Sequence, residues 1–245
     1  YSKWFEQNIR CISYCIKVGE KLKYLVGARG SKLSIAQTSW VVSELKKENS
    51  DSEYEIKPIT TKGDTDTRPL FTIEQKGIFE KEIDKAVAEK EIDFAVHSLK
   101  DIPSDLADNL IIASIPKREK VNDVFISSDG SSLDKIKAGS IIGTSSLRRA
   151  VQIIRQRSDV TVKPIRGNIE TRINKISGEH FDAIVLAQAG ISRLGVDVNF
   201  TPLSTDDFSP SPGQGAIAIV ARADDLKTIE MLKKIEDADS RLEIE

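Results

Sequence analysis

From residue 24 onward, short apolar runs alternate with longer segments in which apolar residues recur at helical spacing. Short apolar runs bounded by turn residues are typical of buried strands, and a 3.6-residue period is typical of helices. The pattern predicts strands at residues 24–28, 54–60, 94–98, 123–127, 140–145, 160–165, 182–187 and 216–221, and helices at residues 33–48, 78–89, 146–157, 169–176, 188–194 and 226–235. This alternation indicates an α/β fold with mixed, mainly parallel sheets and flanking helices.

Two segments rich in charge, proline or glycine interrupt the alternation, at residues 115–123 and 209–215. Such segments are typical of connections between compact units. We therefore expect two lobes with a hinge between them, the first formed by residues 24–116 together with 216–236 and the second by residues 117–211. Two crossings between lobes are typical of a clamp that closes around a ligand.

The chain of 245 residues has 36 basic and 38 acidic side chains and a net charge of -2, so no overall field favours nucleic acid or an anionic membrane. Its only cysteines, Cys11 and Cys15, form neither a disulfide framework nor a zinc signature, and we expect no metal site. No apolar run has transmembrane length and the start does not resemble a signal peptide, which predicts a cytoplasmic protein. Apolar residues at helical spacing predict that residues 1–23 form an N-terminal helical extension.

Basic residues follow four of the predicted strands. Arg29, Lys100 and Arg166 come just after strands, and Arg148 with Arg149 comes just after the hydroxyl-rich segment "GTSS". In open α/β sheets, ligands bind beyond the carboxyl ends of the strands. Helix-start amides, hydroxyls and arginine side chains together bind carboxylate or phosphate. Several such turns in one crevice predict a ligand with several anionic groups.

The helix predicted at residues 146–157 has Arg148 and Arg149 in its first turn and contains no acid, although a helix start is already positive. This conflict with the helix dipole favours a binding role for the two arginines. The apolar residues at helical spacing predict the core face, and they are Leu147, Ala150, Val151 and Ile154. The arginines should then point away from the core, and replacing either should weaken ligand binding with little loss of stability.

Asp101 is the one notable acid among these cationic turns, and it lies on a stiff segment before Pro103. Two interpretations stay open for it: an internal ion pair with a neighbouring arginine, or a carboxylate facing a cationic or NH-bearing part of the ligand. Alternatives also stay open for Arg29, which could be solvated, and for Arg193, which suits the end of a helix electrostatically.

The motifs "VGARGSKLSIAQ", "KGIFEKE", "DFAVHSLKDIP", "GTSSLRRA", "IRGNIETR", "DAIVLAQAGISRLG" and "SPGQGAIAI", in this order, resemble hydroxymethylbilane synthase, also called porphobilinogen deaminase. The resemblance implies two lobes like those of type II periplasmic binding proteins, followed by a small third domain. It also implies tetrapyrrole biosynthesis, in which four porphobilinogen units are joined head to tail with loss of ammonia. The implied partners are porphobilinogen and the growing pyrrole chain, bound by a monomer.

The resemblance implies a role for each matching residue. Asp101 would be the catalytic carboxylate. Residues implied for a dipyrromethane cofactor are Ser98, Lys100, Thr144, Ser145, Ser146, Arg148 and Arg149. Residues implied for substrate are Arg29, Ser31, Gln37, Arg166, Arg172 and Arg193, with Lys76 and Phe79 in an active-site loop.

The sequence departs from this family at the point of cofactor attachment. The family attaches dipyrromethane to a cysteine of the third domain, whereas residues 237–245 correspond only to the start of that domain and contain no cysteine. We therefore expect the covalent attachment site to lie outside this chain and the activity of these 245 residues alone to be low. The alternative function is a non-catalytic, two-lobed receptor for a polycarboxylate small molecule, and nucleic-acid binding is a more distant one.

Overall fold

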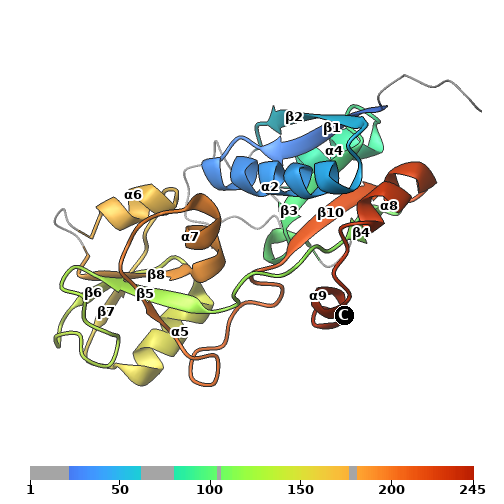
Figure 1. Cartoon of the computed structure of the whole chain (residues 1–245). Helices are drawn as coiled ribbons and strands as arrows, with labels where there is room; N and C mark the ends of the chain where they lie inside the picture. Colours follow the sequence, from blue (N-terminus) through green and yellow to red (C-terminus); the bar gives the residue numbers. More distant parts are fainter. Residues whose placement is uncertain (1–21, 62–79, 104–105, 177–180) are drawn as a thin grey trace, which may run out of the picture.

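The computed structural model describes residues 22–61, 80–103, 106–176 and 181–245, which form two α/β lobes (Figure 1). Each lobe contains one five-stranded sheet. The expected extension at residues 1–23 lies almost entirely outside the described residues, as do Lys76 and Phe79.

The first lobe is built on a sheet with the strand order β2-β1-β3-β10-β4. The strands are β1 (Leu22–Arg29), β2 (Ser52–Ile59), β3 (Phe94–Ser98), β4 (Leu110–Ser114) and β10 (Ile217–Arg222), and the helices are α2 (Lys32–Glu48), α4 (Lys81–Ala88) and α8 (Leu226–Lys233). Helices α2 and α8 share a core with one face of the sheet, and α4 packs on the other face. A 3₁₀ turn, η2 (Leu99–Asp101), directly follows β3.

The second lobe has the strand order β7-β6-β8-β5-β9. The strands are β5 (Asp123–Ser127), β6 (Ile141–Gly143), β7 (Thr161–Lys163), β8 (Ala183–Ala187) and β9 (Thr201–Pro202), and the helices are α5 (Leu147–Gln156), α6 (Ile169–Asn174) and α7 (Gln188–Leu194). Alternate residues of β8 face opposite sides: Val185 joins the core beneath α5, whereas Ile184 and Leu186 join the core beneath α6 and α7.

Both sheets are mixed, but they contain fewer parallel strand pairs than the alternation of strands and helices predicts. In the first lobe β1 pairs in parallel with β2 and β3, whereas β10 runs antiparallel to β3 and β4. In the second lobe β5 is likewise antiparallel to β8 and β9. The antiparallel strands β5 and β10 each come just after a chain crossing. The chain reaches them from the other lobe and not through a helix that connects two parallel strands of the same sheet.

The predicted core face of α5 is wrong. Leu147 and Val151 are 69% and 67% exposed, and Ile154 is also exposed. The helix instead buries Ile153 and Arg149 against the sheet. An arginine takes a core-facing position here because a buried carboxylate lies below it, as described for the site.

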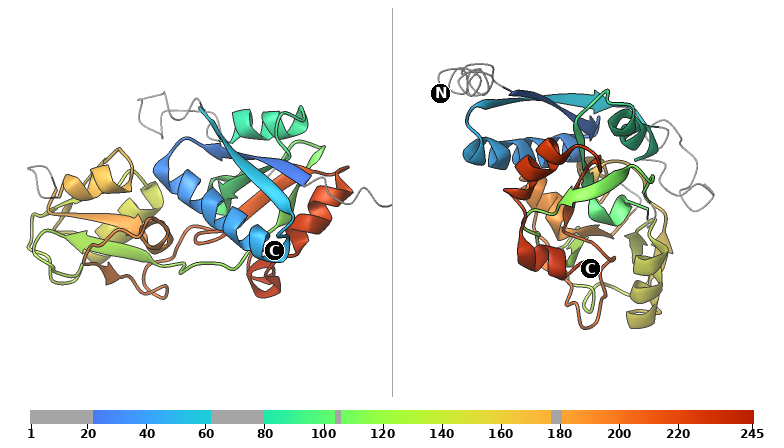
Figure 2. Two further views of the ribbon diagram at one scale, coloured as in Figure 1. Left: turned by 45° about the horizontal axis from the view of Figure 1, so that its top comes forward. Right: turned by 90° about the vertical axis from the view of Figure 1, so that its right-hand side faces the viewer.

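The chain crosses between the lobes near residues 115–122 and again near residues 203–216, and the two crossings bind each other (Figure 2). The amide of Glu119 donates to the carbonyl of Gly215 at 3.1 Å. The final helix, α9 (Ala238–Leu242), adjoins the first crossing, because the amide of Arg118 donates to the Ser240 hydroxyl at 2.8 Å. Within the described residues, no helix combines the length and the apolar character needed to cross a membrane.

Candidate ligand-binding site between the lobes

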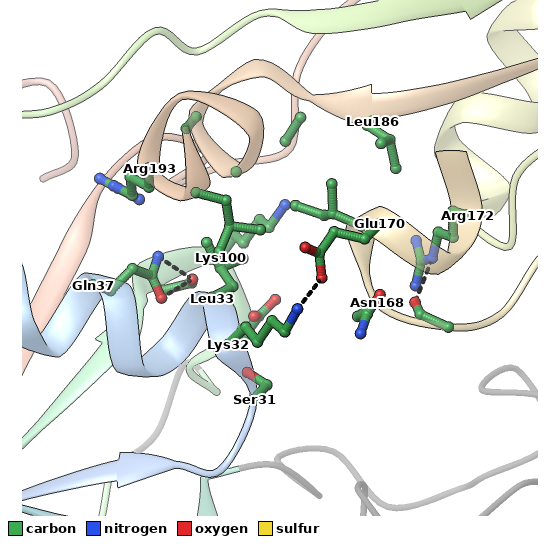
Figure 3. Close-up of a pocket in the computed structure, with 18 of the residues that line it drawn as sticks. Ser31, Lys32, Leu33, Gln37, Lys100, Asn168, Glu170, Arg172, Leu186 and Arg193 are labelled. Carbon is green, nitrogen blue, oxygen red and sulfur yellow. Dashed lines mark hydrogen bonds and ion pairs between the residues drawn. The ribbon is translucent and has the colours of Figure 1, made fainter. Parts of the chain in front are cut away.

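A cavity of about 820 Å³ lies between the lobes, within the size range of small-molecule sites (Figure 3). It opens at the carboxyl ends of β1 and β3 in the first lobe and of β6, β7 and β8 in the second, where sheets of this kind bind ligands. The lining residues expected from the sequence are Arg29, Ser31, Gln37, Ser98, Lys100, Asp101, Ser145, Arg149, Arg166, Arg172 and Arg193. The turns singled out in the sequence therefore do converge on one crevice.

The cavity is strongly cationic. Its basic lining residues are Arg29, Lys32, Lys100, Arg149, Arg166, Arg172 and Arg193, whereas its acidic lining residues are Asp101 and Glu170. Enclosure by protein lowers the pKa of Arg193 to about 10, opposed by the negative charge of Glu119. Enclosure also lowers the pKa of Arg172, and the neighbouring Arg149 and Arg166 lower it further. Cations that are costly to enclose favour an anionic ligand.

Asp101 ends the turn η2 and exposes its carboxylate to the cavity. Within the described residues it forms no hydrogen bond or salt bridge, so the interpretation of Asp101 as a partner in an internal ion pair has no support. Its carboxylate is available to a cationic or NH-bearing group of a ligand.

Lys100 precedes Asp101 and donates from Nζ to Oε1 of Gln214 at 3.4 Å. Its side chain faces the cavity but is enclosed by the walls, and this enclosure lowers the pKa of Lys100 below its usual 10.5. Asp101 opposes the shift, and Arg149 adds to it. A ligand carboxylate beside Lys100 should therefore raise this pKa again.

The lowered pKa of Lys100 predicts a pH limit on anion binding. Affinity for a dicarboxylate should be highest at a pH below the pKa that Lys100 has in the ligand-free protein. The affinity should fall as the pH rises through this pKa, which lies below 10.5. Calorimetry in buffers of different ionisation enthalpy should detect proton uptake on binding in this range. Lys100→Gln should remove the uptake, and uptake that persists in this variant would assign it to another group.

Arg148 and Arg149 meet at a carboxylate that the sequence analysis did not single out. Asp123, the first residue of β5, is fully buried, and its Oδ1 accepts from Arg149 Nη2 at 2.6 Å and Nε at 3.1 Å. Its Oδ2 accepts from Arg148 Nη2 at 2.7 Å. Burial alone would raise the pKa of Asp123, but the two guanidinium groups outweigh it and hold the pKa below its usual 3.8.

Only one of this arginine pair faces the cavity. Arg149 lines it, whereas Arg148 does not and also donates to the carbonyl of Ser209. Thr144 is buried outside the lining, and Ser146 caps α5 by accepting from the amide of Arg149. The expectation that both arginines point away from the core is therefore wrong for Arg149, which is buried.

Gln214 joins the two crossings to this charged cluster and is almost fully buried. Its Nε2 donates to the carbonyl of Val121 at 2.7 Å and to Oδ1 of Asp123 at 2.9 Å, while its Oε1 accepts from Lys100. Gln214 lies in the "PGQG" segment, which the sequence marked as a boundary and as part of a family motif but to which it assigned no site residue. One side chain thereby connects a cavity residue of the first lobe to the buried carboxylate of the second.

Backbone shape places Arg172 at the second-lobe wall. Gly167 has φ of +118°, and a Cβ there would approach the Thr171 side chain to 2.7 Å, so this turn requires glycine. The carbonyl of Gly167 accepts from Arg172 Nε at 2.7 Å, and Asn168 caps α6. Across the cavity, Gln37 donates to the Ser98 hydroxyl at 2.9 Å, which fixes both polar side chains.

A protein-family model described as porphobilinogen deaminase, dipyromethane cofactor binding domain, matches residues 24–230. The chain belongs to the porphobilinogen deaminase family. A probable porphobilinogen deaminase of Nitrosopumilus maritimus (strain SCM1) is 80% identical over 224 residues, which are 91% of this chain and 72% of that protein. A porphobilinogen deaminase of Listeria innocua serovar 6a is 46% identical over 231 residues, covering 92% of this chain and 74% of that protein.

Solved structures support the fold of this porphobilinogen deaminase family member. Substrate binding domain 2 of Lactococcus lactis GlnP has a TM-score of 0.55 at 12% identity, with 89% of each chain covered. The methionine binding protein MetQ has a TM-score of 0.53 at 11% identity, covering 90% of this chain and 93% of that chain. These likenesses confirm a two-lobed fold of the type II periplasmic-binding-protein kind and concern the fold alone.

The cavity fits the dipyrromethane cofactor that names the matched domain. Each pyrrole of this group carries acetate and propionate, and arginine side chains bind carboxylates through paired hydrogen bonds. The basic lining supplies such donors, and the Asp101 carboxylate is an acceptor of the kind that an NH group requires. In the described part of the chain, no group of His, Cys, Asp or Glu side chains is arranged to hold a metal ion.

Proposed function

We propose that this chain binds porphobilinogen in the interlobe cavity and takes part in joining four units head to tail, with release of ammonia, to form hydroxymethylbilane. The observation that carries this proposal is Asp101, a carboxylate that makes no hydrogen bond or salt bridge among the described residues, in a cavity whose other charged lining residues are mainly cations. The cations suit the acetate and propionate of the substrate. The carboxylate suits the part of the substrate that becomes positive.

In this proposal, Asp101 acts on charge that develops during the reaction. Ammonia leaves the aminomethyl group of porphobilinogen, and positive charge develops on the methylene carbon and pyrrole nitrogen. A preorganised carboxylate beside this charge lowers the barrier by electrostatic stabilisation. Enclosure between the lobes strengthens the interaction, because less water screens it.

The proposal assigns the other lining residues to binding. The carboxylates of dipyrromethane would be held by Lys100, Ser98, Ser145 and Arg149. Bound dipyrromethane supplies the primer to which the first substrate unit is joined. Arg148, Thr144 and Ser146 would act indirectly, through the position of Arg149 and the start of α5. The substrate carboxylates would be bound by Arg29, Ser31, Gln37, Arg166, Arg172 and Arg193.

We further propose that residues 24–116 with 216–236 and residues 117–211 move as two lobes about the crossings. The proposal includes action as a monomer, as the family resemblance implies. The presence of only two cysteines in the sequence fits a reducing cytoplasmic compartment.

Release of ammonia from porphobilinogen tests the proposal. The protein with dipyrromethane bound should consume porphobilinogen and release one ammonia for each unit joined, measured by a coupled ammonia assay. Tight binding of porphobilinogen without ammonia release would instead support the receptor function. Failure to bind porphobilinogen would contradict the proposal.

A further inference from the structure

Lys32 and Glu170 face each other across the cavity from the two lobes (Figure 3). Lys32 is the first residue of α2, and Glu170 lies in the first turn of α6. Lys32 Nζ lies 2.7 Å from Glu170 Oε2, and the side chains are 68% and 42% exposed. Neither residue was singled out in the sequence, although Lys32 directly follows the capping Ser31.

This ion pair is easily exchanged. Pairs with such exposure contribute little to stability, because water solvates both partners well when they separate. Glu170 also remains favourably placed when the pair breaks, since a carboxylate in the first turn of α6 complements the helix dipole. A ligand carboxylate can therefore replace that of Glu170 at little cost.

The surroundings of Lys32 favour such a replacement. The first turn of α2 has no acidic residue, and its amides are positive. Arg29 lines the same part of the cavity from the end of β1. The Glu170 carboxylate, which comes from the opposite lobe, thus occupies a place suited to an external carboxylate.

We propose that Lys32 is a further residue that binds a carboxylate of the ligand. In the free protein the Glu170 carboxylate pairs with Lys32, and an acetate or propionate side chain of the ligand displaces the Glu170 carboxylate. This inference rests on the proposed function, because it assigns the pyrrole carboxylates as the displacing groups. Displacement also breaks a link between the lobes as the ligand enters. Glu170 thus competes with the ligand for Lys32, and Lys32 binds the ligand.

The opposite roles of the two residues give opposite effects on binding. The probe is a pyrrole with acetate and propionate side chains but no aminomethyl group, which binds without reacting. Glu170→Gln should raise its affinity about two- to five-fold, and Lys32→Gln should lower it about two- to five-fold. Titration calorimetry measures both, and unchanged melting temperatures would show that folding is intact.

The double variant separates exchange from a general charge effect. In Lys32→Gln protein, adding Glu170→Gln should have no further effect, because the competition acts through Lys32. Glu55→Gln is a matched control: Glu55 forms a similar exposed pair with Lys23 at 2.6 Å, on strands β1 and β2 and outside the cavity lining. It should leave affinity unchanged.

Each other outcome contradicts the inference. If the pair only held the lobes together, both single variants would shift affinity in the same direction. A gain from Glu170→Gln that persisted without Lys32 would show a long-range charge effect, and an unchanged affinity would show no competition. Wild-type protein that failed to bind the pyrrole would overturn the proposed function as well, whereas normal wild-type binding confines the failure to this inference.

Discussion

Asp101→Asn should fold and bind the pyrrole ligand nearly as the wild-type protein does, and should lose turnover by about 10²- to 10³-fold, the scale for removing one preorganised electrostatic group. The substitution keeps the shape of the side chain and removes the charge that, in the proposed function, faces the developing cation. Asp101 makes no hydrogen bond or salt bridge within the described part of the chain, so its loss should leave the fold undisturbed. Single-turnover ammonia release and thermal melting measure the two effects.

Asp108→Asn is the matched control for this experiment. Asp108 is exposed, lies in the segment that follows η2, and does not line the cavity. The same change of charge there should leave turnover unchanged. Asp101→Asn protein that turned over at the wild-type rate would show that this carboxylate has no catalytic role.

Asp123→Ala should destabilise the protein by about 3–5 kcal/mol, the range for removing one partner of a buried ion pair. The loss leaves Arg149, which is only 7% exposed, without its anion and removes an acceptor from Gln214. Urea unfolding measures the change as a lower midpoint.

Asp159→Ala provides the comparison for this loss. Asp159 also pairs with an arginine, Arg157, but it is 45% exposed, so the unfolding midpoint should stay near the wild-type value. If Asp123→Ala unfolded at the wild-type midpoint, the buried cluster would not contribute to stability. Arg149 would then be available for ligand binding alone, as the sequence suggested.

The local pattern of the chain predicted most of the fold and the position of the site. The strands β3 and β5 and the helix α7 have the bounds that were expected from their apolar runs. Strand β4 (Leu110–Ser114) was not expected from the apolar pattern. The cationic turns were predictable because the carboxyl ends of strands meet at one edge of each sheet.

Pairings between distant residues were not predictable. The apolar stripe of Leu147 and Val151 suggested a core face for α5, yet the core position belongs to Arg149, whose partner Asp123 is 26 residues earlier. A single sequence does not show that a buried carboxylate will lie under a particular helix. The pair of Lys32 and Glu170 is likewise set by how the lobes meet, at a separation of 138 residues.

The place of β10 in the first sheet also determines the order in which the chain can fold during synthesis. All five strands of the second lobe lie between Asp123 and Pro202, so that sheet can form as soon as this continuous stretch has left the ribosome. The first sheet must wait, because β10 lies between β3 and β4 and is made only after the entire second lobe. Until then β3 and β4 have unpaired edges, which are prone to aggregation. Of the two lobes, the one whose synthesis begins first is thus completed last.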